Sequence, residues 1–154
     1  MESFLSHIGL FSNLTPEQLK HIESICTEIR LQPGEILFHE GDEPGFFYII
    51  QQGRIRISRI IPGMGEEALA ILEKGSYFGE MEIFEPIPRA AQVMAHTTCV
   101  LQAIRIADLH QAMHDDREMT VSLLWNFVLT LSERLRNTND KVMATFALAK
   151  FAGG

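Results

Sequence analysis

Residues 77–92 read YFGEMEIFEPIPRAAQ and combine a Gly-Glu pair, a short apolar turn, a proline-rich bend and an isolated arginine. Gly79 lets backbone N–H groups approach a ligand closely, because it has no side chain. A group of such N–H donors opposite an arginine suits a phosphate, which makes Arg89 the candidate anion-binding residue. Glu80 precedes Arg89 by nine positions and can hold its guanidinium or accept hydrogen bonds from a sugar hydroxyl. The stretch therefore predicts an anion-binding loop.

The sequence around this loop has the turn signals of a β domain. Between residues 26 and 106, short apolar runs alternate with Pro-Gly, Gly-Asp, Gln-Gly and Lys-Gly turns. This regular spacing is typical of an all-β sandwich or barrel. The expected strands cover residues 35–39, 46–51, 54–60, 67–72, 91–95 and 99–106.

A helix is expected before the β region. Thr15 can be its N-cap, Pro16 fits the first helical position, and Gln18 completes a capping box. We expect this helix to continue to about Ser24. The 154 residues suit one domain. Its expected segments are 1–25 (N-terminal and helical), 26–106 (the β-roll) and 107–154 (C-terminal helices).

After residue 106 the apolar spacing becomes helical. It predicts a short helix over 108–114 and a long helix capped by Asp115, with Glu118 as the capping-box partner. A 3-4 spacing then runs unbroken through Val121, Leu124, Val128, Leu131, Leu135, Thr138, Val142, Thr145 and Ala149. This spacing is typical of a helix that packs on a twin, so we expect a parallel homodimer. The alternative is that the first half packs on its own β-roll and the rest frays.

The loop resembles the phosphate-binding cassette of cyclic-nucleotide-binding domains, the family of the bacterial catabolite activator protein and the regulatory subunits of protein kinase A. The family pattern is F-G-E, hydrophobic-small-hydrophobic, a variable turn, and R-A-A or R-S-A. Here residues 78–83 read FGEMEI and residues 89–91 read RAA. Residues 33–57 also resemble the family's opening strands. The resemblance implies an α+β, mainly β fold: a double-stranded β-helix (jelly roll) with an N-terminal helix and a long C-terminal dimerisation helix.

The resemblance also implies roles for individual residues. Glu80 would bind the ribose 2′-hydroxyl, and Arg89 would bind the exocyclic oxygens of the cyclic phosphate. Backbone N–H groups would complete the cradle. The candidate cassette residues are Phe78, Gly79, Glu80, Met81, Glu82, Arg89, Ala90 and Ala91.

Glu82 departs from the family pattern, which usually has Ala or Gly at this position. A carboxylate close to a bound phosphate repels it by about 1 to 4 kcal/mol, depending on the local dielectric, unless the side chain points away. Three interpretations follow: a cyclic-nucleotide sensor, an interaction module that kept the fold without the ligand, and a domain that binds another small anion.

Thr138 and Asn139 lie within the apolar spacing of the long helix. Together with the flanking residues they resemble the central helix of the catabolite activator group. There the threonine contacts the adenine and its polar neighbour does so across the dimer. The alternative is a polar layer that sets the register of the helix pair.

The preferred ligand is cAMP, possibly cGMP. Ala90 after Arg89 resembles the cAMP-binding pattern, whereas cGMP sites often have threonine there. Movement of the long helix would then signal to an effector protein that the sequence does not identify. We expect no enzyme activity, because the sequence contains no activated nucleophile, paired-carboxylate site or metal cluster. His110 and His114 alone do not make a metal site.

Composition argues against several partners. The net charge is −7 and the pI is about 5.3, without a basic block, which disfavours nucleic-acid binding. The long helix is not followed by a helix-turn-helix, so we expect no direct DNA binding by this chain. No apolar run is long enough to span a membrane. Cys26 and Cys99, far apart and outside any CxxC, are expected to be reduced thiols in a cytoplasmic protein.

Overall fold

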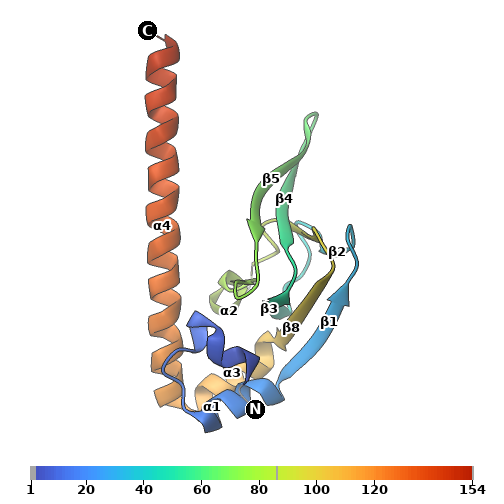
Figure 1. Cartoon of the computed structure of the whole chain (residues 1–154), viewed down its shortest axis with the longest axis vertical. Coiled ribbons are helices and arrows are strands. Elements are labelled where there is room, and N and C mark those ends of the chain that lie inside the picture. The colour runs from blue at the N-terminus through green and yellow to red at the C-terminus, as the bar shows by residue number, and fades with distance from the viewer. Residues whose placement is uncertain (1–2, 86, 154) are drawn as a thin grey trace.

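The computed structural model describes residues 3–85 and 87–153. Within them, the strands and the short helix α2 occupy the middle of the chain, and the other helices lie at its two ends (Figure 1). The strands are β1 (Cys26–Leu31), β2 (Ile36–Phe38), β3 (Phe46–Gln52), β4 (Ile55–Ile61), β5 (Gly65–Leu72), β6 (Tyr77–Phe78), β7 (Gln92–Ala95) and β8 (Cys99–Arg105). The 3-10 helices are η1 (Phe4–His7) and η2 (Gly9–Phe11), and the α-helices are α1 (Pro16–Ser24), α2 (Met81–Phe84), α3 (Ile106–Asp115) and α4 (Arg117–Gly153).

The strands form two antiparallel sheets that pack as a jelly roll. One sheet has the order β1-β8-β3-β6 and the other β2-β7-β4-β5. In β3, Phe47 and Ile49 pack with the helices, whereas Tyr48 and Ile50 pack with residues of the opposite sheet. Successive side chains of a strand point to opposite faces, and all four are buried because both faces of this sheet are covered. The predicted jelly roll is confirmed.

The predicted strands are confirmed, and two more are found. β1 pairs with β8 at the edge of its sheet, and its sequence CTEIRL has few apolar residues to mark it. β6 pairs with β3 through Tyr77 and Phe78 only. A two-residue strand is too short for a periodic pattern, so only the paired structure identifies it.

The N-terminal capping box is confirmed. Thr15 Oγ1 accepts a hydrogen bond from the Gln18 backbone N–H at 3.2 Å, and Gln18 Oε1 accepts one from the Thr15 N–H at 2.9 Å. This reciprocal pair satisfies two donors at the helix start.

The predicted cap of the long helix is wrong by one residue. Asp115 is the last residue of α3, and Asp116 caps α4 instead. Asp116 Oδ1 accepts from the Met119 backbone N–H at 2.9 Å, and Oδ2 accepts from Gln18 Nε2 at 3.1 Å. With Asp116 as the cap, the third helical position is Met119, so Glu118 cannot complete a capping box.

Replacing Asp116 with alanine is expected to lower the melting temperature, because α4 loses its cap and α1 loses the Gln18 contact. The Met119 N–H bond, foremost, holds the pKa of Asp116 below its usual value. The charged carboxylate of Asp116 therefore stabilises the folded domain at pH values above the pKa of Asp116 in the unfolded chain. This contribution is lost as the pH falls through the pKa of Asp116 in the folded domain. Thermal unfolding followed by circular dichroism at neutral and acidic pH checks both effects. Asp116→Asn is the control and should retain most of the stability, since asparagine caps well. Equal losses in both variants at neutral pH would contradict the capping role.

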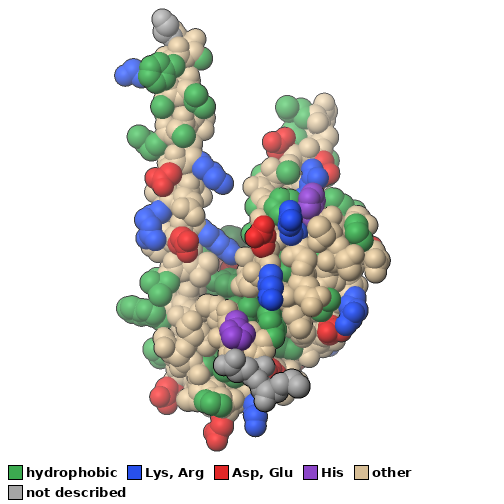
Figure 2. All heavy atoms as spheres, in the orientation of Figure 1, with side chains coloured by type: hydrophobic (Ala, Val, Ile, Leu, Met, Phe, Trp, Pro, Cys, Tyr) green, Lys and Arg blue, Asp and Glu red, His purple; other side chains and the backbone are tan. Residues whose placement is uncertain are grey.

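Among the described residues, α4 buries side chains against the rest of the domain only in its first turns. Met119, Leu123 and Phe127 are buried against the other helices and the first sheet. Asn126 donates through Nδ2 to the backbone oxygens of Leu10 and Ser12, at 2.8 and 3.0 Å. The helix of 37 residues is roughly 55 Å long and extends well past the roll (Figure 1). Figure 2 shows hydrophobic side chains on the part of α4 that extends beyond the roll. The β4–β5 hairpin projects in the same direction, across a gap from this part of the helix.

Candidate functional site

The turn between β6 and α2 is built around Gly79. This residue has a φ of 84°, in the left-handed region that favours glycine. A Cβ at this position would lie 2.8 Å from Nη1 of Arg89 and 3.2 Å from the carbonyl oxygen of Phe46. Any side chain here would displace the guanidinium, so glycine is required for Arg89 to occupy its place.

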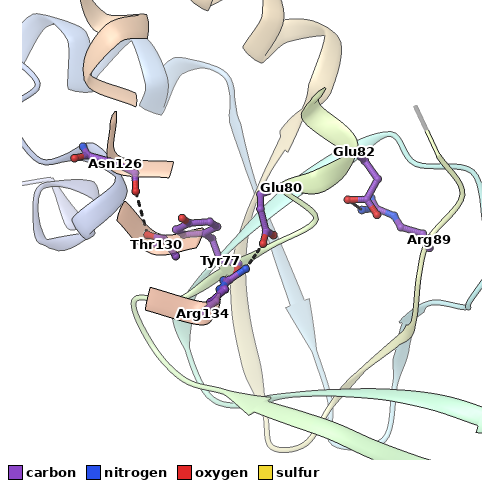
Figure 3. A network of polar contacts seen from close by, with 7 residues as sticks. All are labelled: Tyr77, Glu80, Glu82, Arg89, Asn126, Thr130 and Arg134. Carbon is purple, nitrogen blue, oxygen red and sulfur yellow. Dashed lines mark hydrogen bonds and ion pairs between the residues drawn. The ribbon is translucent and has the colours of Figure 1, made fainter. Parts of the chain in front are cut away.

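Arg89 is buried, with a side chain only 3% exposed. Its Nη2 donates to the Phe46 carbonyl oxygen at 2.6 Å, and its guanidinium carbon lies 4.2 Å from the centre of the Phe38 ring. Nη1 is buried without a hydrogen-bond partner in the described part of the chain. The Glu82 carboxylate lies beside it, with Oε2 at 3.5 Å (Figure 3). A buried charged donor without an acceptor is costly, so Nη1 is available to an incoming oxygen.

Glu80 is buried and forms an ion pair with Arg134, which comes from α4 (Figure 3). Arg134 Nη2 also donates to the Tyr77 carbonyl oxygen at 3.2 Å, and its guanidinium carbon lies 5.3 Å from the Tyr77 ring centre. These contacts connect α4 to the cassette beyond its buried first turns. The first turns of the helix are thus fixed by apolar packing, and the part around Arg134 is held by an ion pair and a hydrogen bond.

A cavity of about 420 Å³ lies between the β-roll and α4. This size is within the usual range for small-molecule pockets. Of the predicted site residues, those that line it are Phe78, Gly79, Glu80, Met81, Glu82, Ala90, Ala91 and Thr138. Its apolar wall comes from Phe38, Ile57, Ala70, Leu72 and Val93.

Two predicted site residues do not line the cavity. Arg89 is absent from the lining and contacts Glu82, which is part of it. Asn139 follows Thr138 on a helix that turns by about 100° per residue. α4 contributes three further lining residues that were not predicted as site residues, namely Arg134, Asn137 and Lys141. Together with Thr138 they follow the i, i+3, i+4, i+7 spacing of one helix face. That spacing could have indicated them once Thr138 was placed.

The tyrosines near the site remain neutral. Burial raises the pKa of Tyr48, and the charge of Arg89 only partly opposes this. Burial likewise raises the pKa of Tyr77, with smaller opposing effects from the Thr130 side chain and then from the Arg134 charge. With the tyrosines neutral, the charged groups that line the cavity are the carboxylates of Glu80 and Glu82 and the cations of Arg134 and Lys141. The cation of Arg89 lies next to Glu82. The site can receive one additional negative charge without becoming strongly anionic.

Two other kinds of site are not found over residues 3–85 and 87–153. No group of three or more His, Cys, Asp or Glu side chains there could hold a metal ion. None of the helices in this part of the chain is long and apolar enough to cross a bilayer.

A two-sheet roll with a glycine turn around a buried arginine, and a cavity closed by a helix, defines a small-molecule-binding jelly roll. The family model described as "Cyclic nucleotide-binding domain" matches residues 28–116, more than half of the chain. The chain belongs to this family, as its cassette predicts.

Two relatives illustrate the range of the family. A cAMP-dependent protein kinase regulatory subunit from Hypocrea atroviridis is 33% identical over 94 residues, covering 61% of this chain and 19% of that protein. A CRP-like cAMP-activated global transcriptional regulator from Mycobacterium tuberculosis is 28% identical over 142 residues, covering 92% of this chain and 62% of that protein. The chain thus spans less than two thirds of either relative.

Solved structures agree with this assignment. The N-terminal domain of a transcriptional regulator from Streptomyces coelicolor has a TM-score of 0.74 and 32% identity, over 90% of this chain and 96% of that one. The Thermus thermophilus catabolite activator protein has a TM-score of 0.75 and 26% identity, over 87% of this chain and 61% of that one.

Proposed function

We propose that this chain is a cyclic-nucleotide sensor whose ligand is cAMP. The observation that carries the proposal is the Nη1 of Arg89, which is buried without a hydrogen-bond partner in the described residues and lies 3.5 Å from Glu82. Glu82 and Glu80 both line the cavity. Arg89 binds the cyclic phosphate, and Glu80 binds the ribose 2′-hydroxyl. The backbone amides that follow Gly79 and Arg89 complete the cradle, as in the family whose cassette the chain resembles.

The adenine lies toward α4 in this proposal. Thr138 lines the cavity and contacts the base from its own chain. Asn139 of the partner subunit contacts the base from the other side, which requires a parallel dimer. The exposure of Val121, Leu124, Val128 and Leu135 supports this dimer, because these side chains form a stripe that the chain itself leaves open.

The signal is a movement of α4. Ligand binding at Glu80 competes with the Arg134 ion pair and so changes the contact that holds the helix to the cassette. The ligand shifts the equilibrium between two helix positions by no more than its difference in affinity for them. An effector protein reads the position of α4, and the chain itself carries out no catalytic step.

The cysteines are compatible with a reducing, cytoplasmic setting. Cys26 and Cys99 are both free. Burial, foremost, raises the pKa of Cys26 to about 12, so its thiol is protonated and unreactive at neutral pH.

A second candidate function is a ligand-free interaction module. Its support is that Arg89 already faces Glu82 and Glu80 already faces Arg134, so the site's charges are paired without a ligand. A domain that retained the roll for its α4 surface alone would tolerate such pairs permanently.

Calorimetric titration of the full chain with cAMP, cGMP and 5′-AMP separates these functions. We expect cAMP to bind about tenfold more tightly than cGMP, since Ala90 offers no hydroxyl to the guanine ligand; this equals about 1.4 kcal/mol. 5′-AMP is the control, because its open phosphate carries a second charge and does not fit a cradle for a phosphodiester. Binding of cAMP no tighter than millimolar by the wild type and by variants lacking the Glu82 carboxylate would favour the interaction module.

A further inference from the structure

We infer that Glu82 is a built-in anion that competes with the ligand phosphate for Arg89 and so sets the nucleotide concentration to which the chain responds. This inference rests on the proposed function. It assigns Glu82 an affinity-setting role that the cassette pattern alone does not give it.

Glu82 lines the cavity and lies beside Arg89, with its Oε2 3.5 Å from Nη1. Its side chain is 7% exposed and that of Arg89 is 3% exposed, so water screens the pair little. Phe46 and Phe38 occupy other sides of the guanidinium, which leaves Nη1 as its free edge. Glu82 lines the cavity and Arg89 does not, so the carboxylate stands at the edge that a ligand must reach.

The geometry of the pair leaves a donor unused. Glu82 Oε2 lies 3.5 Å from Arg89 Nη1, yet Nη1 makes no hydrogen bond in the described residues. The carboxylate therefore neutralises the cation without using its directed donor. A phosphodiester oxygen that enters can make a charge-assisted hydrogen bond with this donor, and such bonds are stronger than a charge contact alone.

Competition follows from the charges. A carboxylate and a cyclic phosphodiester each carry one negative charge, and close contact between them in a buried site is repulsive. Ligand binding must therefore turn Glu82 away from Arg89, toward the open side of the cavity. The free energy needed for this exchange is subtracted from the affinity for the nucleotide.

The test is titration of cAMP into wild type, Glu82→Gln and Glu82→Ala, with Glu85→Gln as the matched control. The glutamine substitution at position 82 keeps the size of the side chain and removes its charge, and Glu85 is an exposed glutamate at the end of the same short helix. We expect both Glu82 variants to bind cAMP about tenfold or more tightly than wild type, and the Glu85 variant to match wild type. Without ligand, Glu82→Ala should melt at a lower temperature, because Arg89 loses its counter-charge.

Opposite changes in melting temperature and affinity separate competition from a structural role. A residue that only supports the fold would lower both together. Unchanged or weaker binding in both Glu82 variants, with a wild type that binds, would overturn the competition and leave the sensor function intact. Absence of binding in every variant would instead overturn the sensor function. Binding of cAMP by the Glu82 variants, together with no measurable binding by the wild type, would support the competition.

Discussion

The variant Arg89→Ala should bind cAMP about thirtyfold or more weakly than wild type. Removing one partner of a buried charged contact costs about 2–5 kcal/mol in binding, which corresponds to roughly 30- to 5,000-fold. Arg89 belongs to this class, because its side chain is 3% exposed and its Nη1 is buried without a hydrogen-bond partner in the described residues. Calorimetry on wild type and variant measures the loss directly.

Loss of folding must be separated from loss of binding in this experiment. Arg89→Ala leaves the Glu82 carboxylate buried without a cation, which destabilises the domain. The double variant Arg89→Ala/Glu82→Ala removes both charges and should fold while still failing to bind. Arg30→Ala is the matched control, since Arg30 is an exposed arginine on β1. Binding by the double variant as tight as that of Glu82→Ala would show that the phosphate does not depend on Arg89.

The parts of the fold that the sequence predicts well are those set by local chemistry. The Thr15 cap depends on residues three positions apart, and both of its hydrogen bonds are found. The local sequence offers two adjacent aspartates that could each cap α4, and the predicted cap, Asp115, is the wrong one. The choice of Asp116 depends on Gln18, which lies 98 positions away and binds its second oxygen. Long-range contacts of this kind are not visible in spacing.

The site divides in the same way. The cassette motif locates Gly79, Glu80 and Arg89 near one another, because glycine and arginine are required there for local reasons. Arg134 lies 54 positions beyond Glu80, and its contact depends on how α4 docks against the roll. The sequence predicts repulsion between Glu82 and a phosphate, but only the packed structure places that carboxylate 3.5 Å from Arg89.

Substitution of Leu135 with lysine should convert the expected α4 dimer to monomers, raising its dissociation constant at least about a hundredfold. Leu135 belongs to the 3-4 apolar spacing and is 61% exposed in the single chain. In a symmetric pair each leucine meets its own copy, so one substitution removes two apolar contacts and places two positive charges together. Burial of each leucine is worth about 1.5–3 kcal/mol, and both are lost. Sedimentation equilibrium over a range of protein concentrations measures the change.

Leu129→Lys provides the matched control, because Leu129 lies on the same helix, is 55% exposed and falls outside the 3-4 spacing. The two variants carry the same substitution, so an equal effect would show that general exposure, and not the stripe, drives association. Weaker cAMP binding by the monomeric Leu135 variant is also expected, because Asn139 of the partner subunit would no longer reach the base. Thr138 lies in the cavity of its own chain, so the loss should be partial. A monomer that binds as tightly as the dimer would confine the pocket to a single chain and remove the link between ligand and assembly.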